Sequence, residues 1–217
     1  MAQNEEPMLQ YPPLPSADFG SPPVFSRMIV LFPGREVAPL YCVLELLDIQ
    51  NEHLPYEALS YVWGTEIDEE PLWCNDVPLR ITLNLAQALR RLRYPGEGQY
   101  RRLWVDAVCI NQRDDQERAR QVGYMRLVYK HAARTIIWLG QRDHETAEAV
   151  RFTRELGQLY AEIMAQAMRA NAQGSTQNII AQRETIQEIM VNAFRNNVEG
   201  AGALDRLLQR PYFERVW

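Results

Sequence analysis

The chain has 217 residues, 47% hydrophobic and 24% charged, which suits one globular domain, or one domain with an insertion, able to bury a sizeable core. The formal net charge is −5, and the basic residues include a single lysine, Lys130. Because a dedicated nucleic-acid binder usually carries a basic face, we expect no nucleic-acid partner.

Residues 1–25 are rich in proline, serine and acids, and we expect them to form a mobile leader. The leader lacks the basic and apolar regions of a secretory signal. No apolar run approaches the roughly 20 residues needed to span a bilayer, so we expect no transmembrane segment. Together these features predict a cytoplasmic protein.

Four strand-like segments come first. Residues 27–31 and 40–49 are β-type apolar runs, predicting a small N-terminal β extension. Residues 57–63 are typical of a buried strand and end at Gly64. The stretch 72–82 places Asn75-Asp76 between two short apolar pieces, which predicts a hairpin.

The middle of the chain alternates between strands and helices. A helix capped by Thr82 or Asn84 is followed by the strongest predicted strand, 102–110. A second helix begins at Asp114 or Asp115, and a further central strand at 135–139 stops at Gly140. This order predicts an α/β fold with a sheet of mostly parallel strands and helices on both faces.

The segment 143–209 has a different character, with no proline and much Ala, Gln, Glu and Arg. Two apolar stripes at helical spacing, separated by Gly174-Ser175, predict a helical hairpin inserted into, or laid upon, the α/β domain of residues 26–217. The chain then ends on the apolar and aromatic run 210–217, so we expect a truncation at the C-terminus.

The sequence lacks the motifs of several common catalytic and cofactor-binding sites. The phosphate-binding loop, the dinucleotide-binding glycine motif and the nucleophile elbow are all absent. The three histidines are scattered, so we expect no metal site. Three widely spaced cysteines do not suggest a disulfide framework and favour a reducing compartment. Cys109 is better explained as a buried thiol than as a nucleophile.

Ligands of open α/β sheets bind at the carboxyl ends of the strands, and the polar run after residue 105 lies there. Asp106 interrupts an apolar strand, so it either makes capping or loop hydrogen bonds or is a weak candidate for catalysis. Trp63 can stack on a nicotinamide or adenine ring, or wedge over the sheet edge. The run 113–118 is either a solvated first turn or part of a binding loop. The candidate ligand-binding residues are Ser60, Trp63, Asp106, Asn111, Gln112, Asp115, Glu117 and Arg118.

Four segments resemble, in order, the fungal heterokaryon-incompatibility (HET) domain family, which is distantly similar to TIR domains. They are YEALSYVWG at 56–64, LWVDAVCINQ at 103–112, the stretch from Met125 to Gly140, and RPYFERVW at 210–217. The resemblance implies a TIR-like or flavodoxin-like fold and a role in non-self recognition and programmed cell death.

The resemblance also implies two alternative activities. The first is TIR-like hydrolysis of NAD, which would be a substrate and not a bound cofactor. The glutamate expected to catalyse it follows the last motif and would lie beyond Trp217, so no residue here takes that role by motif match. The second is a non-catalytic signalling module that self-associates or binds protein partners.

Overall fold

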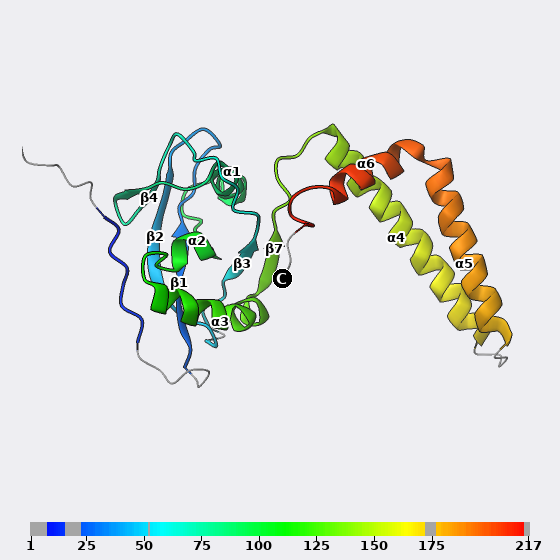
Figure 1. The fold of residues 1–217 in the computed structure, drawn as a ribbon, viewed down its shortest axis with the longest axis horizontal. Coiled ribbons are helices and arrows are strands. Elements are labelled where there is room, and N and C mark those ends of the chain that lie inside the picture. The colour runs from blue at the N-terminus through cyan, green and yellow to red at the C-terminus, as the bar shows by residue number, and fades with distance from the viewer. Residues whose placement is uncertain (1–7, 16–22, 52, 172–176, 215–217) are drawn as a thin grey trace, which may run out of the picture. The chain divides into compact units, whose positions relative to one another are not determined.

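The computed structural model describes residues 8–15, 23–51, 53–171 and 177–214, and it divides into two compact units, 1–140 and 141–217. Figure 1 labels their elements. The N-terminal unit contains β1 (Phe25–Leu31), β2 (Leu40–Asp48), β3 (Glu57–Ser60), β4 (Leu72–Cys74), β5 (Val77–Leu79), α1 (Leu83–Leu92), β6 (Arg101–Trp104), α2 (Asp106–Cys109), α3 (Asp115–His131) and β7 (Arg134–Ile137). The C-terminal unit contains α4 (His144–Asn171), α5 (Gln177–Asn196) and α6 (Val198–Leu208).

The seven strands form one sheet in the order β5-β4-β2-β1-β6-β3-β7. The prediction of a mostly parallel sheet is wrong, because three of the six strand pairings are antiparallel. The parallel group β6-β3-β7 brings the carboxyl ends of its strands to one edge. β7 lies at the border of the sheet and not in its centre as expected. The general α/β prediction is confirmed.

The two N-terminal strands are integral to the sheet, which corrects the expectation of a small β extension. β1 lies between β2 and β6 and pairs with both in antiparallel orientation. Its side chains from Ser26 to Leu31 are all buried. Successive side chains of a strand point to opposite faces of the sheet, so both faces are covered at β1, which explains its continuous apolar run.

The predicted strand 102–110 is shorter than expected. β6 ends at Trp104, and Asp106–Cys109 form a single helical turn, α2. The Asp106 carbonyl accepts the backbone N–H of Ile110, which closes this turn at 3.2 Å. An apolar run does not by itself distinguish a strand from a buried helical turn.

The local signals for turns and helix starts are confirmed. Asn75 and Asp76 both have positive φ, 50° and 62°, as a tight β4–β5 hairpin requires. Thr82 caps α1, so Asn84 is available for another role. Asp114 caps α3 by accepting the backbone N–H groups of Gln116 and Glu117.

Part of the segment expected to be a mobile leader packs against the sheet. Leu9 is buried, and Arg27 lies over the Tyr11 ring, 5.0 Å from its centroid. The Pro12 carbonyl accepts a 2.7 Å hydrogen bond from Arg27. Residues 8–15 are therefore tied to the fold, whereas 1–7 and 16–22 lie outside the described residues.

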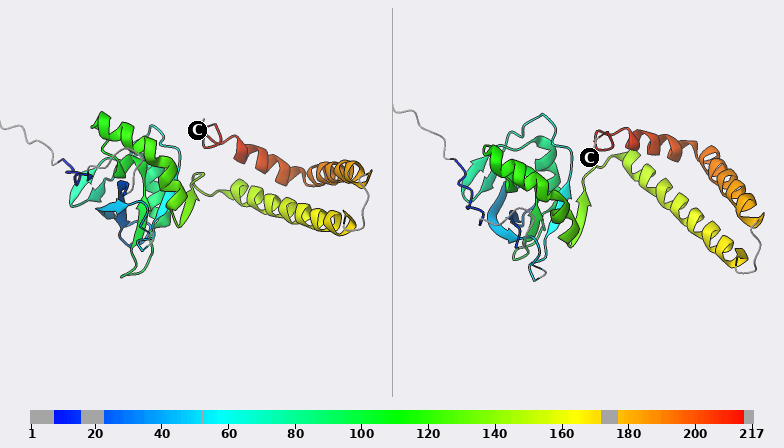
Figure 2. Two further views of the ribbon diagram at one scale, coloured as in Figure 1. Left: turned by 90° about the horizontal axis from the view of Figure 1, so that it is seen from below. Right: turned by 60° about the horizontal axis from the view of Figure 1, so that its bottom comes forward.

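The C-terminal unit contains three helices where the sequence predicted two. Figures 1 and 2 show α4 and α5 side by side, with α6 returning along α4. Phe152 of α4 makes an edge-to-face contact with Phe194 of α5, with ring centroids 5.2 Å apart. Gly174-Ser175, the expected turn, lies outside the described residues. Among the described helices, none is long and apolar enough to cross a membrane.

Candidate functional site

The structure brings two predicted site residues together at the carboxyl ends of the parallel strands. Trp63 follows β3, and Asp106 follows β6, the strand beside it. The Trp63 indole N–H donates a 2.9 Å hydrogen bond to Oδ2 of Asp106. This bond fixes one edge of an indole that remains 42% exposed, so part of the ring is available to a ligand.

Hydrogen bonds hold the Asp106 carboxylate in place. Its Oδ1 accepts the backbone N–H of Ala107 at 2.8 Å, and its backbone carbonyl accepts the Gln112 amide at 3.0 Å. The Tyr61 hydroxyl lies nearby, and burial and the neighbouring Asp106 charge raise the pKa of Tyr61 well above its usual value. Asp106 therefore makes the loop hydrogen bonds that were one of its two expected roles, while also orienting Trp63.

Asn84, the second residue of α1, links the exits of the two neighbouring strands β3 and β7. Its Nδ2 donates to the Val62 carbonyl at 2.6 Å, and its Oδ1 accepts the Trp138 indole N–H at 2.8 Å. Ser60 is buried, and its carbonyl accepts the backbone N–H of Trp138. Asn84 and Trp138 thus belong to the candidate site, and we name the cluster Tyr61, Trp63, Asn84, Asp106 and Trp138 the strand-exit cluster.

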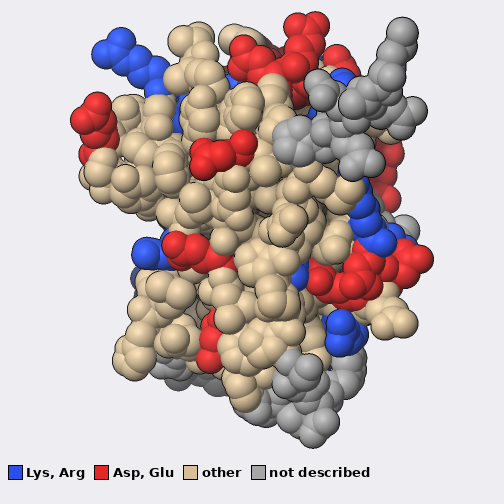
Figure 3. Space-filling view, turned by 90° about the vertical axis from the view of Figure 1, so that its left-hand side faces the viewer, with Lys and Arg blue, Asp and Glu red and all other residues tan. Residues whose placement is uncertain are grey.

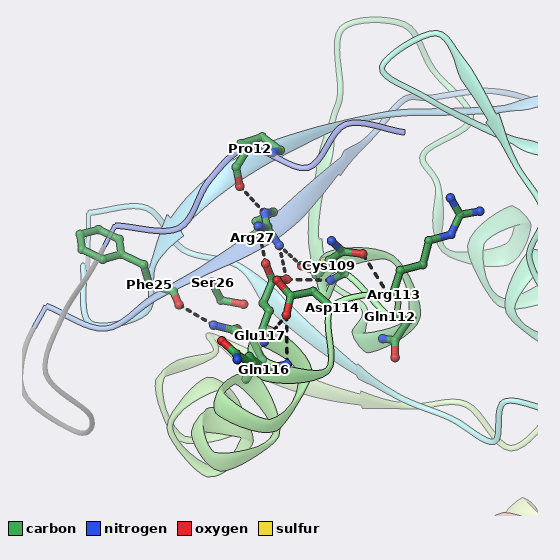
Figure 4. Close-up of polar contacts among 12 residues, drawn as sticks. Pro12, Phe25, Ser26, Arg27, Cys109, Gln112, Arg113, Asp114, Gln116 and Glu117 are labelled. Atoms are coloured by element: carbon green, nitrogen blue, oxygen red, sulfur yellow. Dashed lines mark hydrogen bonds and ion pairs between the residues drawn. The ribbon is translucent and has the colours of Figure 1, made fainter. Parts of the chain in front are cut away.

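Glu117 lies in a buried ion pair, shown in Figure 4. Its two carboxylate oxygens accept bonds of 2.7 and 2.9 Å from the guanidinium of Arg27, and the side chains are 9% and 1% exposed. Such a two-pronged pair is geometrically specific and strong. Glu117 also accepts the backbone N–H of Asn111 at 2.8 Å.

The Arg27–Glu117 pair fastens the loop 109–117 to β1. Arg27 also donates to the Cys109 carbonyl at 3.2 Å, so one guanidinium holds both the end of α2 and the start of α3. Asn111 then accepts the backbone N–H of Arg113 through its side chain. Glu117 therefore shapes the loop from inside and is not displayed to a ligand, which differs from its predicted role, whereas Asn111 is half-buried and its role in binding stays a prediction.

Asp115 and Arg118 fulfil the alternative of a solvated first turn. They pair with each other at 2.8 Å, and their side chains are 83% and 46% exposed. Arg118 also donates to the Gln112 carbonyl at 3.1 Å. Neither residue contacts the strand-exit cluster through a bond described in the structure.

Cys109 is not an available nucleophile. Its thiol is fully buried, and burial raises its pKa to about 12. Within the described ranges, no group of three or more His, Cys, Asp or Glu is placed to hold a metal ion. The three cysteines are unpaired thiols, all buried.

The opposite, amino-terminal ends of the same strands carry a second ionic group. Glu57 of β3 accepts hydrogen bonds from Arg101 of β6 and from Arg134 of β7. Burial alone would raise the pKa of Glu57, but the two arginines outweigh it, and the pKa is lowered. This group ties the three parallel strands together and involves none of the predicted site residues.

Sequence reasoning missed Arg27, Asn84 and Trp138 as parts of this region. A charged residue at the start of the apolar run 27–31 was the available signal for Arg27, since arginine is seldom buried without a partner. For Asn84 the sequence pattern predicted only a possible role as a helix cap, a role that Thr82 takes in the structure. The contacts of Asn84 depend on residues that lie 22 and 54 positions away.

The chain matches a protein-family model and a known protein. The family model described as "Heterokaryon incompatibility protein (HET)" matches residues 56–217. The chain is also similar to a Neurospora crassa protein called "Heterokaryon incompatibility protein 6, OR allele", at 28% identity over 224 residues. That similarity covers 93% of this chain but 32% of the relative, so the chain spans about a third of the relative's length. No solved structure matches.

Proposed function

The chain belongs to the heterokaryon incompatibility (HET) family, and from that membership we propose that it acts in fungal non-self recognition and the programmed cell death that follows. The name of the Neurospora crassa relative supports the same role. The match over residues 56–217 carries this proposal, because it includes both the strand exits and the helical unit. In this proposal residues 26–217 form the HET domain, with 143–209 as its helical insertion.

We further propose a TIR-like arrangement in which the strand-exit cluster binds NAD. The three neighbouring parallel strands β6-β3-β7 support it, since ligands of open α/β sheets bind at the carboxyl ends of strands. The partly exposed ring of Trp63 supports it most directly. Stacking of a base on such a ring tolerates any flat heterocycle.

The candidate reaction is hydrolysis of NAD. Water replaces nicotinamide at the ribose carbon, which gives nicotinamide, ADP-ribose and a proton. The bond breaks through a state with positive charge on the ribose, as in glycoside hydrolysis. Asp106 is the carboxylate of the strand-exit cluster and would stabilise that charge while holding Trp63. Both of its side-chain oxygens already accept hydrogen bonds, so we assign it positioning and electrostatic roles.

The test measures NAD binding by calorimetry and nicotinamide release by chromatography for the 217-residue chain. Trp63→Ala should weaken binding about fivefold or more, from the roughly 1–3 kcal/mol that one stacking contact contributes. Tyr100→Ala is the matched control, since Tyr100 is 53% exposed and precedes β6 at the other end of the strands. Equal binding by wild type and Trp63→Ala would exclude the strand-exit cluster as the NAD site.

A non-catalytic signalling module is the second candidate. One observation favours it: the carboxylates of Asp106 and Glu117 are both engaged in hydrogen bonds or ion pairs. In that case NAD would bind without turnover, or would not bind. Cell death caused by the chain in the absence of nicotinamide release would support this module and contradict hydrolysis.

A further inference from the structure

Charge is strongly segregated along the N-terminal unit. Residues 36–79 contain ten Asp or Glu and no Lys or Arg. Residues 118–140 contain five Lys or Arg and no Asp or Glu. Figure 3 shows several groups of acidic side chains on one face, with basic side chains also present. Two segments of one compact unit therefore carry opposite net charge.

The acidic part includes a groove of about 530 Å³. Arg90 is its one basic residue and pairs with Asp68 at 2.8 Å and with Glu70 at 3.4 Å. Its lining residues are Glu36, Val37, Glu66, Ile67, Asp68, Glu69, Glu70, Leu83 and Arg90. The carboxylates of Glu66 and Glu69 form no ion pair with any described residue, whereas the charge of Glu36 interacts with that of Arg93.

The groove is not purely ionic. Val37 is 90% exposed and Ile67 44% exposed, so apolar surface lies among the carboxylates. Unpaired carboxylates beside apolar surface are electrostatically complementary to a partner that carries basic and apolar side chains. The occupant must bring positive charge together with some apolar surface.

The outer face of α3 has that composition. Its buried face consists of Glu117, Gln121, Tyr124 and Val128. At 100° per residue, Arg126 and Lys130 lie together on the opposite side, with Val122 next to them. Both basic side chains are exposed and make no hydrogen bond or ion pair within the described ranges. Val122 is 54% exposed. We call these three residues the α3 basic stripe.

We propose that two copies of this chain associate by docking the α3 basic stripe of one copy into the acidic groove of the other. Charge complementarity carries the inference, because the groove contains the unpaired carboxylates of Glu66 and Glu69 and the stripe contains two unpaired cations. The groove and the stripe are different surfaces, so the contact is heterologous and can continue from copy to copy. This association does not depend on whether the strand-exit cluster binds NAD.

The test measures self-association of the full 217-residue chain by sedimentation at several salt concentrations. One variant reverses the groove, Glu66→Lys with Glu69→Lys, and a second reverses the stripe, Arg126→Glu with Lys130→Glu. A charge-matched control, Glu45→Lys with Glu97→Lys, changes exposed acids that do not line the groove. Circular dichroism verifies that each variant is folded.

Wild type should associate at low salt and dissociate as salt rises, because the Debye length shrinks from about 8 Å at 0.15 M to about 3 Å at 1 M. Each reversal should raise the dissociation constant at least about tenfold, while the control should stay within about threefold of wild type. The two reversed variants should bind each other when mixed, and a chain with both reversals should associate again. A wild type that is monomeric at every salt concentration, or folded reversals that associate like wild type, would overturn the proposal.

Discussion

Replacing Glu117 by glutamine should destabilise the N-terminal unit more than any surface charge change. The substitution keeps the size of the side chain but leaves the Arg27 guanidinium, 1% exposed, without a counter-charge. Removing one partner of a buried ion pair typically costs about 3–5 kcal/mol, because the remaining charge stays buried and unpaired. Arg27 keeps its bonds to the Pro12 and Cys109 carbonyls, so we expect a loss near 3 kcal/mol.

Urea unfolding followed by tryptophan fluorescence measures this loss, since Trp104 is fully buried in the same unit. Asp115→Asn is the matched control, because it breaks an exposed ion pair on the same helix and should cost less than about 0.5 kcal/mol. The double variant Arg27→Met with Glu117→Leu should be more stable than Glu117→Gln, because it leaves no buried charge. A cost below about 1 kcal/mol for Glu117→Gln would refute the reasoning.

Three further predictions concern other parts of the chain. The pKa of Glu57 is lowered in the fold, so its contribution to the free energy of unfolding is complete above its ordinary value of 4.5 and is lost as pH falls through the lowered pKa. Urea titrations at several pH values should therefore show wild type approaching Glu57→Gln only in acid, and a constant difference would contradict this. Gly200→Ala should lower the melting temperature of the helical unit, because the added Cβ would lie 2.8 Å from Phe152, whereas Gly157→Ala meets nothing within 4 Å and should raise stability by about 0.5–1 kcal/mol. Cys109 should resist iodoacetamide in the native protein and react after denaturation, as counted by mass spectrometry, and rapid native labelling would contradict its burial.

Local features of the fold were readable from the sequence. The Asn75-Asp76 turn and the caps at Thr82 and Asp114 depend on side chains within a few residues of the backbone that they serve. The α3 helix and the general α/β class followed from the same short-range patterns. These signals do not require knowledge of what lies across the sheet.

The pairing of strands and side chains that are far apart in the sequence could not be predicted in the same way. The central position of β1 depends on its pairing with β6, where Ile29 lies opposite Leu103. The burial of Glu117 depends on Arg27, 90 residues away in sequence. An exposed acid in a first turn and one that enters the core have the same local pattern. For this reason the sequence analysis placed Glu117 among the exposed residues of 111–118, whereas the structure buries it.

Within the candidate site, the pairing of Trp63 with Asp106 was within reach of sequence reasoning. Both residues follow neighbouring parallel strands, and a carboxylate inside an apolar segment requires a donor. The contribution of Asn84 could not be predicted. Asn84 lies in the first turn of α1, which follows β3, β4 and β5 in the chain, and the fold brings it back to the end of β3.

We propose that this HET-family chain signals cell death through its strand-exit cluster. The most direct measurement is the fraction of dead hyphal cells, scored by vital-dye uptake, after induced expression of the chain in a filamentous fungus. We predict death with wild type and with the control Tyr100→Ala, and survival with the combined variant Trp63→Ala and Asp106→Asn at equal protein level. Equal killing by the combined variant, or survival with wild type, would contradict the claim.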